Sequence, residues 1–141
     1  MKKNRPAILI TSMLICLCTS AFSQIAFPTM TINLSFPQYQ KLKLDGGSVY
    51  IEGAGWKGII LYRLNENTYL AYERACSHHP NEGCASVQVD GSSLFMICHC
   101  CHSSFNFSDG QPMGGPASRP LIQYRVDLEG TTLKISDEII N

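Results

Sequence analysis

Short runs in which apolar and polar residues alternate recur along this chain, and a two-residue period is typical of β-strands with one buried face. The alternation is clearest at residues 31–34 and 39–44. Other apolar runs bounded by turn residues extend the set of predicted strands, which adds residues 49–51, 58–64, 68–72, 87–89, 94–97, 105–107, 121–126 and 131–135. No segment shows a convincing helical period, so we predict an all-β domain of short antiparallel strands.

Turn residues join six of these strands into three hairpins. The turns are residues 65–67 (Asn-Glu-Asn), 90–91 (Asp-Gly) and 129–130 (Glu-Gly). Residues 111–120 are rich in Pro and Gly and are predicted to form a loop. The middle hairpin separates two segments rich in cysteine and histidine, and we expect it to bring them together at one end.

The composition is that of one folded domain. The chain has 141 residues, of which 45% are hydrophobic and 16% charged, and this argues against disorder. The N-terminus differs, because three basic residues precede an apolar run at 7–18 that ends in small and polar residues. This order is typical of a secretory signal peptide, so we predict that residues 1–23 are removed after Ser23, leaving a domain of residues 24–141.

Two alternatives to cleavage concern the same segment. Left uncleaved, the apolar run could attach the protein to a membrane, but it is shorter than the roughly 20 residues that a spanning helix needs. Cys16 or Cys18 could carry a lipid, but the bulky Ile15 or Leu17 precedes each of them where a lipoprotein signal has a small residue. We therefore expect an exported protein, either periplasmic or extracellular.

Removal of the signal peptide changes the charge of the protein. The full chain has 11 basic and 11 acidic side chains, and three of the basic ones lie in residues 1–23. The mature chain therefore has 8 basic and 11 acidic side chains, a formal net charge of −3. No stretch concentrates Lys and Arg, which argues against nucleic acid as a partner.

Metal-binding side chains are concentrated in residues 76–102. This stretch holds all four histidines and five of the seven cysteines of the chain. Residues 76–78 read Cys-Ser-His, and residues 98–102 read Cys-His-Cys-Cys-His. Thiolate and imidazole groups at such spacings suit zinc or an iron–sulfur cluster.

The number of cysteines favours a metal site as well. An exported protein meets an oxidising environment in which cysteine pairs persist as disulfides. The mature chain has five cysteines, an odd number, so at least one has a role other than internal pairing. Two hairpin loops that each offer Cys and His can hold a [2Fe–2S] cluster, with two thiolates on one iron and two imidazoles on the other.

With this arrangement the sequence resembles a Rieske-type domain. That family has C-x-H in one loop and C-x-x-H in the next, followed by a G-S-x-F-D-like stretch, a Gly and a G-P-A loop. Residues 76–78 match the first box, and the later landmarks follow in order at residues 103–106, Gly110, 115–117, 120–121, Tyr124 and Val126. The resemblance covers about residues 40–136 and implies a small Rieske-type antiparallel β-domain with two ligand-bearing hairpin loops.

The second box departs from the family pattern. When the sequence is registered on Phe105, the family Cys falls on Cys98 and the family His falls on Cys101. When it is registered on His102, the family Cys falls on His99, and only a one-residue bulge lets Cys98 and His102 serve together. The fourth ligand is therefore Cys101 or His102, and we favour Cys101 because its register needs no bulge.

The resemblance also implies a ligand set and a cross-link. It makes Cys76, His78 and Cys98 the first three cluster ligands, and it pairs Cys84 with Cys100 in a disulfide between the two loops. In the family, the loop equivalent to residues 114–117 covers the cluster and limits the access of water. Two alternatives stay open, a domain held only by disulfides and a zinc site made by the thiolates of Cys76, Cys84, Cys98 and Cys101.

A Rieske-type cluster implies one-electron transfer. We therefore expect an exported accessory electron carrier that serves a redox protein partner of unknown identity. The chain has no second domain of the kind that oxygenases carry, so we do not expect it to act on a substrate of its own. The alternative is a non-redox structural or binding module with the same fold.

Overall fold

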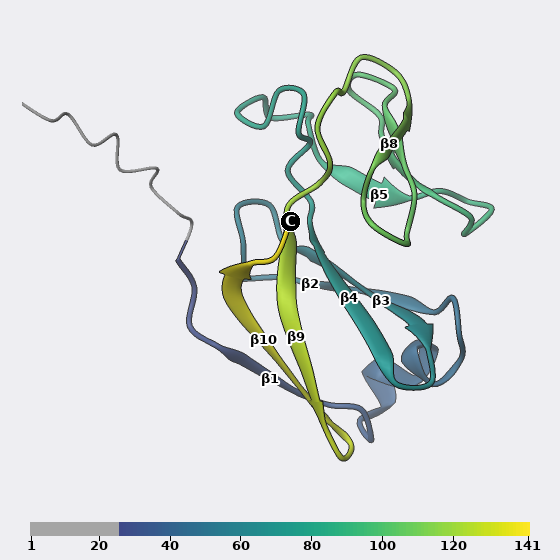
Figure 1. The fold of residues 1–141 in the computed structure, drawn as a ribbon, viewed down its shortest axis with the longest axis vertical. Helices are drawn as coiled ribbons and strands as arrows, with labels where there is room; N and C mark the ends of the chain where they lie inside the picture. Colours follow the sequence, from purple (N-terminus) through teal and green to yellow (C-terminus); the bar gives the residue numbers. More distant parts are fainter. Residues whose placement is uncertain (1–25) are drawn as a thin grey trace, which may run out of the picture.

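The structure, a computed structural model, describes residues 26–141 and contains two antiparallel β-sheets (Figure 1). The larger sheet has six strands in the order β1-β10-β9-β4-β3-β2. Their bounds are Met30–Asn33 (β1), Ser48–Ile51 (β2), Ile59–Asn65 (β3), Thr68–Glu73 (β4), Gln123–Glu129 (β9) and Thr132–Ile139 (β10). The predicted signal peptide and its cleavage site lie outside the described residues.

The smaller sheet is inserted between β4 and β9. Its four strands have the order β5-β6-β7-β8 and the bounds Val87–Val89 (β5), Met96–Cys98 (β6), Ser104–Phe105 (β7) and Pro112–Gly114 (β8). In the larger sheet β4 and β9 pair with each other, with Ala71 opposite Tyr124 and Tyr72 opposite Gln123. The chain therefore leaves the larger sheet and returns to it at neighbouring positions, and the smaller sheet lies beyond the ends of these strands (Figure 1).

The all-β prediction and its three hairpins are confirmed. The structure pairs β3 with β4, β5 with β6 and β9 with β10, all antiparallel. The predicted loop at 111–120 contains one short strand, β8, which pairs with β7. The hairpin of β5 and β6 separates the two cysteine-rich segments, as the sequence predicts.

One predicted strand is wrong. Residues 39–44 lie mainly in a 3₁₀ helix, η1 (Pro37–Lys43), and not in a strand. Pro37 at the start of this helix has a fixed φ that suits a first helical turn. Leu42 is only 1% exposed whereas Leu44 is 73% exposed, although a strand would place both on the same face. The alternation at 39–44 therefore did not mark a buried face.

The described residues form two hydrophobic cores. The core of the larger sheet is built mainly from Ile32, Leu42, Ile59, Leu61, Ala71, Tyr124, Leu133 and Ile135. The second core joins the smaller sheet to β3 and β4 of the larger one, and it contains Ile60, Tyr72, Cys76, Val87, Met96, Cys98, Phe105 and Leu121. Two of the predicted ligands, Cys76 and Cys98, thus lie among apolar side chains that exclude water from their sulfur atoms.

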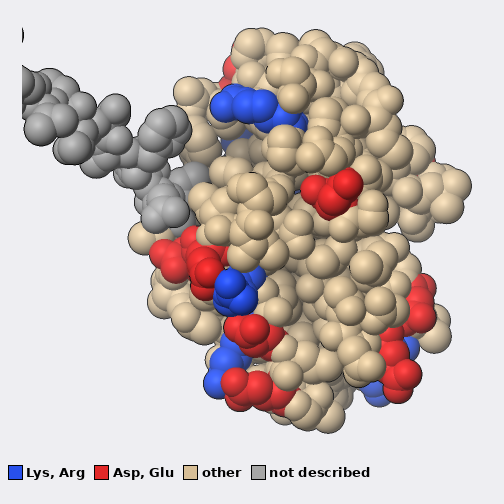
Figure 2. All heavy atoms as spheres, in the orientation of Figure 1, with Lys and Arg blue, Asp and Glu red and all other residues tan. Residues whose placement is uncertain are grey.

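Charged side chains of both signs are interspersed on the surface. On the face shown in Figure 2, Lys and Arg lie beside Asp and Glu, and no cluster of basic residues is visible. Arg125 pairs with Glu138, and Lys134 pairs with Glu129, across the β9–β10 hairpin. Within residues 26–141 there is no helix with the length and hydropathy needed to cross a bilayer.

Candidate metal centre

Two loops of the smaller sheet bring three cysteine sulfurs together. The first ligand loop, residues 74–86, connects β4 to β5 and carries Cys76, and the second ligand loop, residues 99–103, follows Cys98 at the end of β6 and carries Cys101. The Sγ atoms of these three cysteines all lie within 4.8 Å of one another. Cys76 and Cys98 are fully buried and Cys101 is half-buried. We call these three residues the sulfur group.

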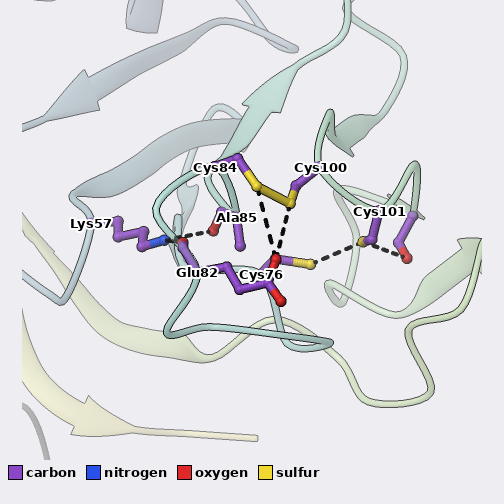
Figure 3. Close-up of a disulfide and its surroundings, with 8 residues drawn as sticks. Lys57, Cys76, Glu82, Cys84, Ala85, Cys100 and Cys101 are labelled. Atoms are coloured by element: carbon purple, nitrogen blue, oxygen red, sulfur yellow. Dashed lines mark hydrogen bonds between the residues drawn. A yellow bond between two sulfur atoms is a disulfide. The ribbon is translucent and has the colours of Figure 1, made fainter.

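The backbone of each loop fixes its cysteine. In the first ligand loop, the N–H of Cys76 donates to the carbonyl oxygen of Ala85 at 3.0 Å. In the second, the N–H of Cys98 donates to the carbonyl of Ser103 at 2.9 Å, and the N–H of His102 donates to the carbonyl of Cys98 at 2.7 Å. These bonds close a tight turn that directs Cys101 back toward Cys76, and the two Sγ atoms lie 3.5 Å apart (Figure 3).

A third segment closes over the second ligand loop. The Ser103 hydroxyl is buried, lies 3.1 Å from the Cys101 Sγ and accepts a hydrogen bond from the N–H of Ala117 at 3.0 Å. At Gly115 (φ +86°) a Cβ would lie only 2.5 Å from the Cα of Ser103, so only glycine allows this approach. Residues 115–117 therefore pack directly on the loop that carries Cys101.

The surroundings of the thiols shift their acidity in opposite directions. Burial raises the pKa of the Cys76 thiol to about 12, and its hydrogen bonds with the neighbouring thiols act in the same direction. Burial also acts to raise the pKa of Cys101, but its hydrogen bonds with Ser103 and with the thiols of Cys76 and Cys98 outweigh the effect of burial, so this pKa is lowered. The half-buried thiol of Cys101 is thus more easily ionised than that of Cys76.

The histidines lie outside the sulfur group. His78 is half-buried in the first ligand loop, where its ring centroid lies 3.9 Å from that of His79. His79, His99 and His102 are exposed, and His102 has a positive φ of 59° at the turn. The structure thus brings together Cys76, Cys98 and Cys101 from the predicted ligands. It places His78 outside the sulfur group, two residues after Cys76 in the first ligand loop, and leaves His102 on the surface.

The predicted cross-link between the loops is confirmed. Cys84 and Cys100 form a disulfide with a Cα–Cα distance of 5.4 Å (Figure 3). A carboxylate oxygen of Glu82 lies 3.5 Å from the Cys100 sulfur and 3.9 Å from the Cys84 sulfur. Because the Cys84 sulfur is bonded to Cys100, it cannot also be a thiolate ligand, and the four-cysteine zinc site that includes it is excluded in this form of the protein.

Lys57 lies in the turn between β2 and β3 and supports the first ligand loop. Its ammonium group donates to the carbonyl oxygen of Glu82, and it lies 3.3 Å from the carbonyl oxygen of Ala85 (Figure 3). Ala85 is also the acceptor for the N–H of Cys76. Lys57 therefore holds the segment that positions the first cysteine.

Glu73 organises the start of the same loop and was missed by the sequence analysis. Its carboxylate is buried and accepts four hydrogen bonds. One oxygen accepts from the N–H groups of Lys57 (2.9 Å) and Ala75 (2.8 Å), and the other from the N–H of Trp56 (2.6 Å) and the hydroxyl of Tyr124 (2.9 Å). An acidic residue at the end of an apolar strand was the one available signal, and it did not identify these donors.

The donor set fits a thiophilic metal centre. Three buried or half-buried thiols converge, and the imidazole of His78 lies in the first ligand loop beside Cys76. Thiolate and imidazole are the ligands of zinc sites and of iron–sulfur clusters.

Comparisons with known proteins show similarity in structure only. No protein-family model matches the chain, and no curated protein matches it in sequence. Among solved structures, a chain from the complex of reduced oxygenase and oxidised ferredoxin in carbazole 1,9a-dioxygenase is 16% identical, with a TM-score of 0.54, and the match covers 84% of this chain and 98% of that one.

Two ferredoxins are also similar. The ferredoxin of carbazole 1,9a-dioxygenase from Nocardioides aromaticivorans is 20% identical over 67% of this chain and 88% of that chain, with a TM-score of 0.47. A Sphingomonas yanoikuyae ferredoxin is 19% identical over 68% of this chain and 92% of that chain, with a TM-score of 0.46. At these identities the comparisons concern the fold, and the first of them supports what the two sheets and their loops indicate, which is a small Rieske-type antiparallel β-domain.

Proposed function

We propose that this protein is an exported electron carrier that binds a [2Fe–2S] cluster at the sulfur group. The observation that carries the proposal is the convergence of Cys76, Cys98 and Cys101 from two disulfide-linked loops of a Rieske-type fold. A cluster of this type, when bound, accepts and releases one electron at a time.

Four residues of the two loops would hold the cluster. These are Cys76 and Cys98 as one pair, and His78 and Cys101 as the other. Because Cys101 stands where the resemblance expects a histidine, three thiolates would ligate the irons instead of two. Each thiolate adds negative charge, so we expect a lower reduction potential than that of a centre with two histidines. With one imidazole, the potential would also depend less on pH.

The protein itself supplies a dry and rigid site. Cys76 and Cys98 are fully buried in the core between the smaller sheet and strands β3 and β4, and residues 115–117 pack on Ser103 next to Cys101. The disulfide between Cys84 and Cys100 and the contacts of Lys57 hold the two loops in place. Such restraint keeps the ligands in one arrangement and excludes water from the buried sulfurs.

The partner is proposed to be another redox protein. One similar solved structure comes from a complex of an oxygenase with its ferredoxin, which is a pairing of this kind. The half-buried Cys101 and the exposed His102 place the second ligand loop at the surface, where a partner can approach. The place of the carrier and its partner outside the cytoplasm is also part of the proposal.

The test is reconstitution of the purified mature protein with iron and sulfide in the absence of oxygen. We expect about two irons and two acid-labile sulfides per chain, visible absorption, and an electron paramagnetic resonance signal after one-electron reduction. Cys101→Ser should abolish or strongly perturb that signal, whereas His102→Ala should leave it intact. The reverse result would make His102 the fourth ligand, and absence of any [2Fe–2S] signal in the wild-type protein would refute the electron-transfer function.

A second candidate is a structural or binding module that holds a single metal ion. It is favoured by the close grouping of three sulfurs within 4.8 Å, since thiolates around one tetrahedral ion also converge in this way. His78 would then complete the site, since it is half-buried whereas the other three histidines are exposed. Metal analysis of the protein as purified separates the two: one zinc without sulfide supports this candidate, and iron with sulfide supports the carrier.

A further inference from the structure

Two cysteines of the sulfur group lie close enough to each other for a disulfide to form between them with little movement. Cys76 and Cys101 are 25 residues apart in sequence, and their Sγ atoms lie 3.5 Å apart. Neither takes part in the disulfide of the structure. We propose that the metal-free protein forms a second disulfide, between Cys76 and Cys101, by exchange with a small-molecule disulfide such as oxidised glutathione.

The existing disulfide favours this pairing. Cys100, which is bonded to Cys84, is the residue directly before Cys101, so the two loops are already tied together next to the new bond. Most of the entropy lost on closing a loop is therefore lost before Cys76 and Cys101 react. A bond between them would add a second link between the same two loops without bringing distant segments together.

Accessibility sets the order of reaction. Cys101 is half-buried, whereas Cys76 and Cys98 are fully buried, so a dissolved disulfide reaches Cys101 first. Cys101 attacks one sulfur of oxidised glutathione, forming a mixed disulfide and releasing one glutathione thiolate. The Cys76 sulfur then attacks the Cys101 sulfur and releases the second glutathione thiolate.

The exchange is balanced in atoms and electrons. Two protein thiols lose two protons and two electrons and become one disulfide. One oxidised glutathione gains them and becomes two glutathione thiols. Cys98 keeps its thiol, so the five cysteines of residues 26–141 end as two disulfides and one thiol.

The second disulfide would remove two of the three converging sulfurs from metal binding. A metal ion or cluster bound by Cys76 and Cys101 would in turn block the disulfide. The two states exclude each other, and the redox state of the surroundings would decide whether the site can be loaded. The disulfide itself does not depend on which metal the protein binds, so it can form even if the proposed cluster does not.

The pairing is tested by differential alkylation of the metal-free mature protein, prepared with a chelator and without reductant. Before treatment, intact mass should show three alkylatable thiols in the denatured protein; after oxidised glutathione, it should show one. The disulfides are then reduced, and the thiols that this releases are labelled with a second reagent. The first reagent should be found on Cys98 alone. A disulfide that includes Cys98, or three alkylatable thiols after treatment, would overturn the proposal.

Variants and a metal probe complete the test. Cys98→Ala should still lose both remaining thiols of the sulfur group on oxidation, whereas Cys101→Ser should keep its two. Cd²⁺ titration, followed by the ultraviolet thiolate-to-cadmium absorption, should give a strong signal with the reduced protein and lose at least tenfold in affinity after oxidation. Undiminished Cd²⁺ binding by the oxidised protein would refute the exclusion between disulfide and metal. Thiol counting needs no iron, so this proposal and the electron-carrier function can fail independently.

Discussion

At the residue scale, the buried carboxylate of Glu73 is the polar group on which the first ligand loop depends. We expect Glu73→Gln to destabilise the protein. Each carboxylate oxygen accepts two hydrogen bonds, and the amide nitrogen that replaces one oxygen cannot accept, so two buried donors would lose their acceptor. Each buried donor left without an acceptor costs roughly 1–3 kcal/mol, so the free energy of unfolding should fall by at least about 2 kcal/mol. Urea unfolding measures this change.

The matched control for Glu73 is Glu66→Gln in the exposed β3–β4 turn, which makes the same chemical change in solvent. Its effect should stay within about 0.5 kcal/mol. Equal losses in the two variants would show that the four hydrogen bonds of Glu73 do not contribute to stability.

Two buried tyrosines should make the protein sensitive to alkaline pH. Burial raises the pKa of Tyr72 and of Tyr124, with further contributions from Asp109 and Glu73 respectively. The folded protein thus keeps both hydroxyls protonated at a pH where the unfolded chain ionises them. Their contribution to stability is full below about pH 10, the unfolded pKa, and is lost as the pH rises toward the folded pKa.

The measurement is the free energy of unfolding as a function of pH above about 9. Each tyrosine should add a slope of roughly 1.4 kcal/mol per pH unit once the unfolded state ionises. Tyr72→Phe should make the decline shallower by about this amount, although it also removes the hydrogen bond to the carbonyl of Phe107. An unchanged slope in that variant would contradict the expectation.

Residues whose chemistry is rare in proteins were easier to predict than residues whose role depends on their surroundings. The crowding of Cys and His in 76–102 led to Cys76, Cys98 and Cys101, which the structure brings together. Glu73 could not be found in this way, because its four donors come from three separate parts of the chain. Only the folded arrangement shows that a single glutamate accepts from all of them.

At the scale of elements, the two ligand loops depend on the disulfide that joins them. We expect the double variant Cys84→Ser, Cys100→Ser to lower the free energy of unfolding of the metal-free protein by about 3 kcal/mol, since the cross-link closes a loop of 16 residues. Thermal or denaturant unfolding without reductant measures this loss.

A non-thiol reductant supplies the control for the cross-link. It should lower the stability of the wild-type protein to nearly that of the double variant and have little effect on the variant itself. If Cys84 and Cys100 were both alkylated in the folded, unreduced protein, the pairing would be refuted.

Elements were predictable where turns and hydrophobic period agreed. The hairpins of β3–β4, β5–β6 and β9–β10 each have turn residues between two apolar runs, and all three are present. Residues 39–44 had the alternation alone, and there the preceding Pro37 and the packing of Leu42 produced a 3₁₀ helix. Neither the pairing of β4 with β9 nor the order of strands in the sheets follows from local pattern, because both depend on contacts between distant segments.

At the scale of the whole molecule, the export prediction concerns the part of the chain before the described residues. If residues 1–23 are a signal peptide, the protein recovered from the exporting cell should begin at Gln24, as intact mass and N-terminal peptide analysis would show. A protein that retains residues 7–18 would contradict cleavage. An added lipid mass on a chain that begins at Cys16 or Cys18 would instead show a lipoprotein.

The chain leaves the larger sheet at β4 and returns to it at the neighbouring strand β9. This connection affects how the smaller sheet can unfold. The smaller sheet follows β4 and precedes β9 in the chain, so it can open locally while the pairing of the six strands is kept, at the cost of its contacts with Ile60, Leu70 and Tyr72. Amide hydrogens of β5–β8 should then exchange with solvent sooner than those of β3, β4 and β9. Such openings would give a metal or a reductant access to sulfurs that the closed structure buries, without global unfolding.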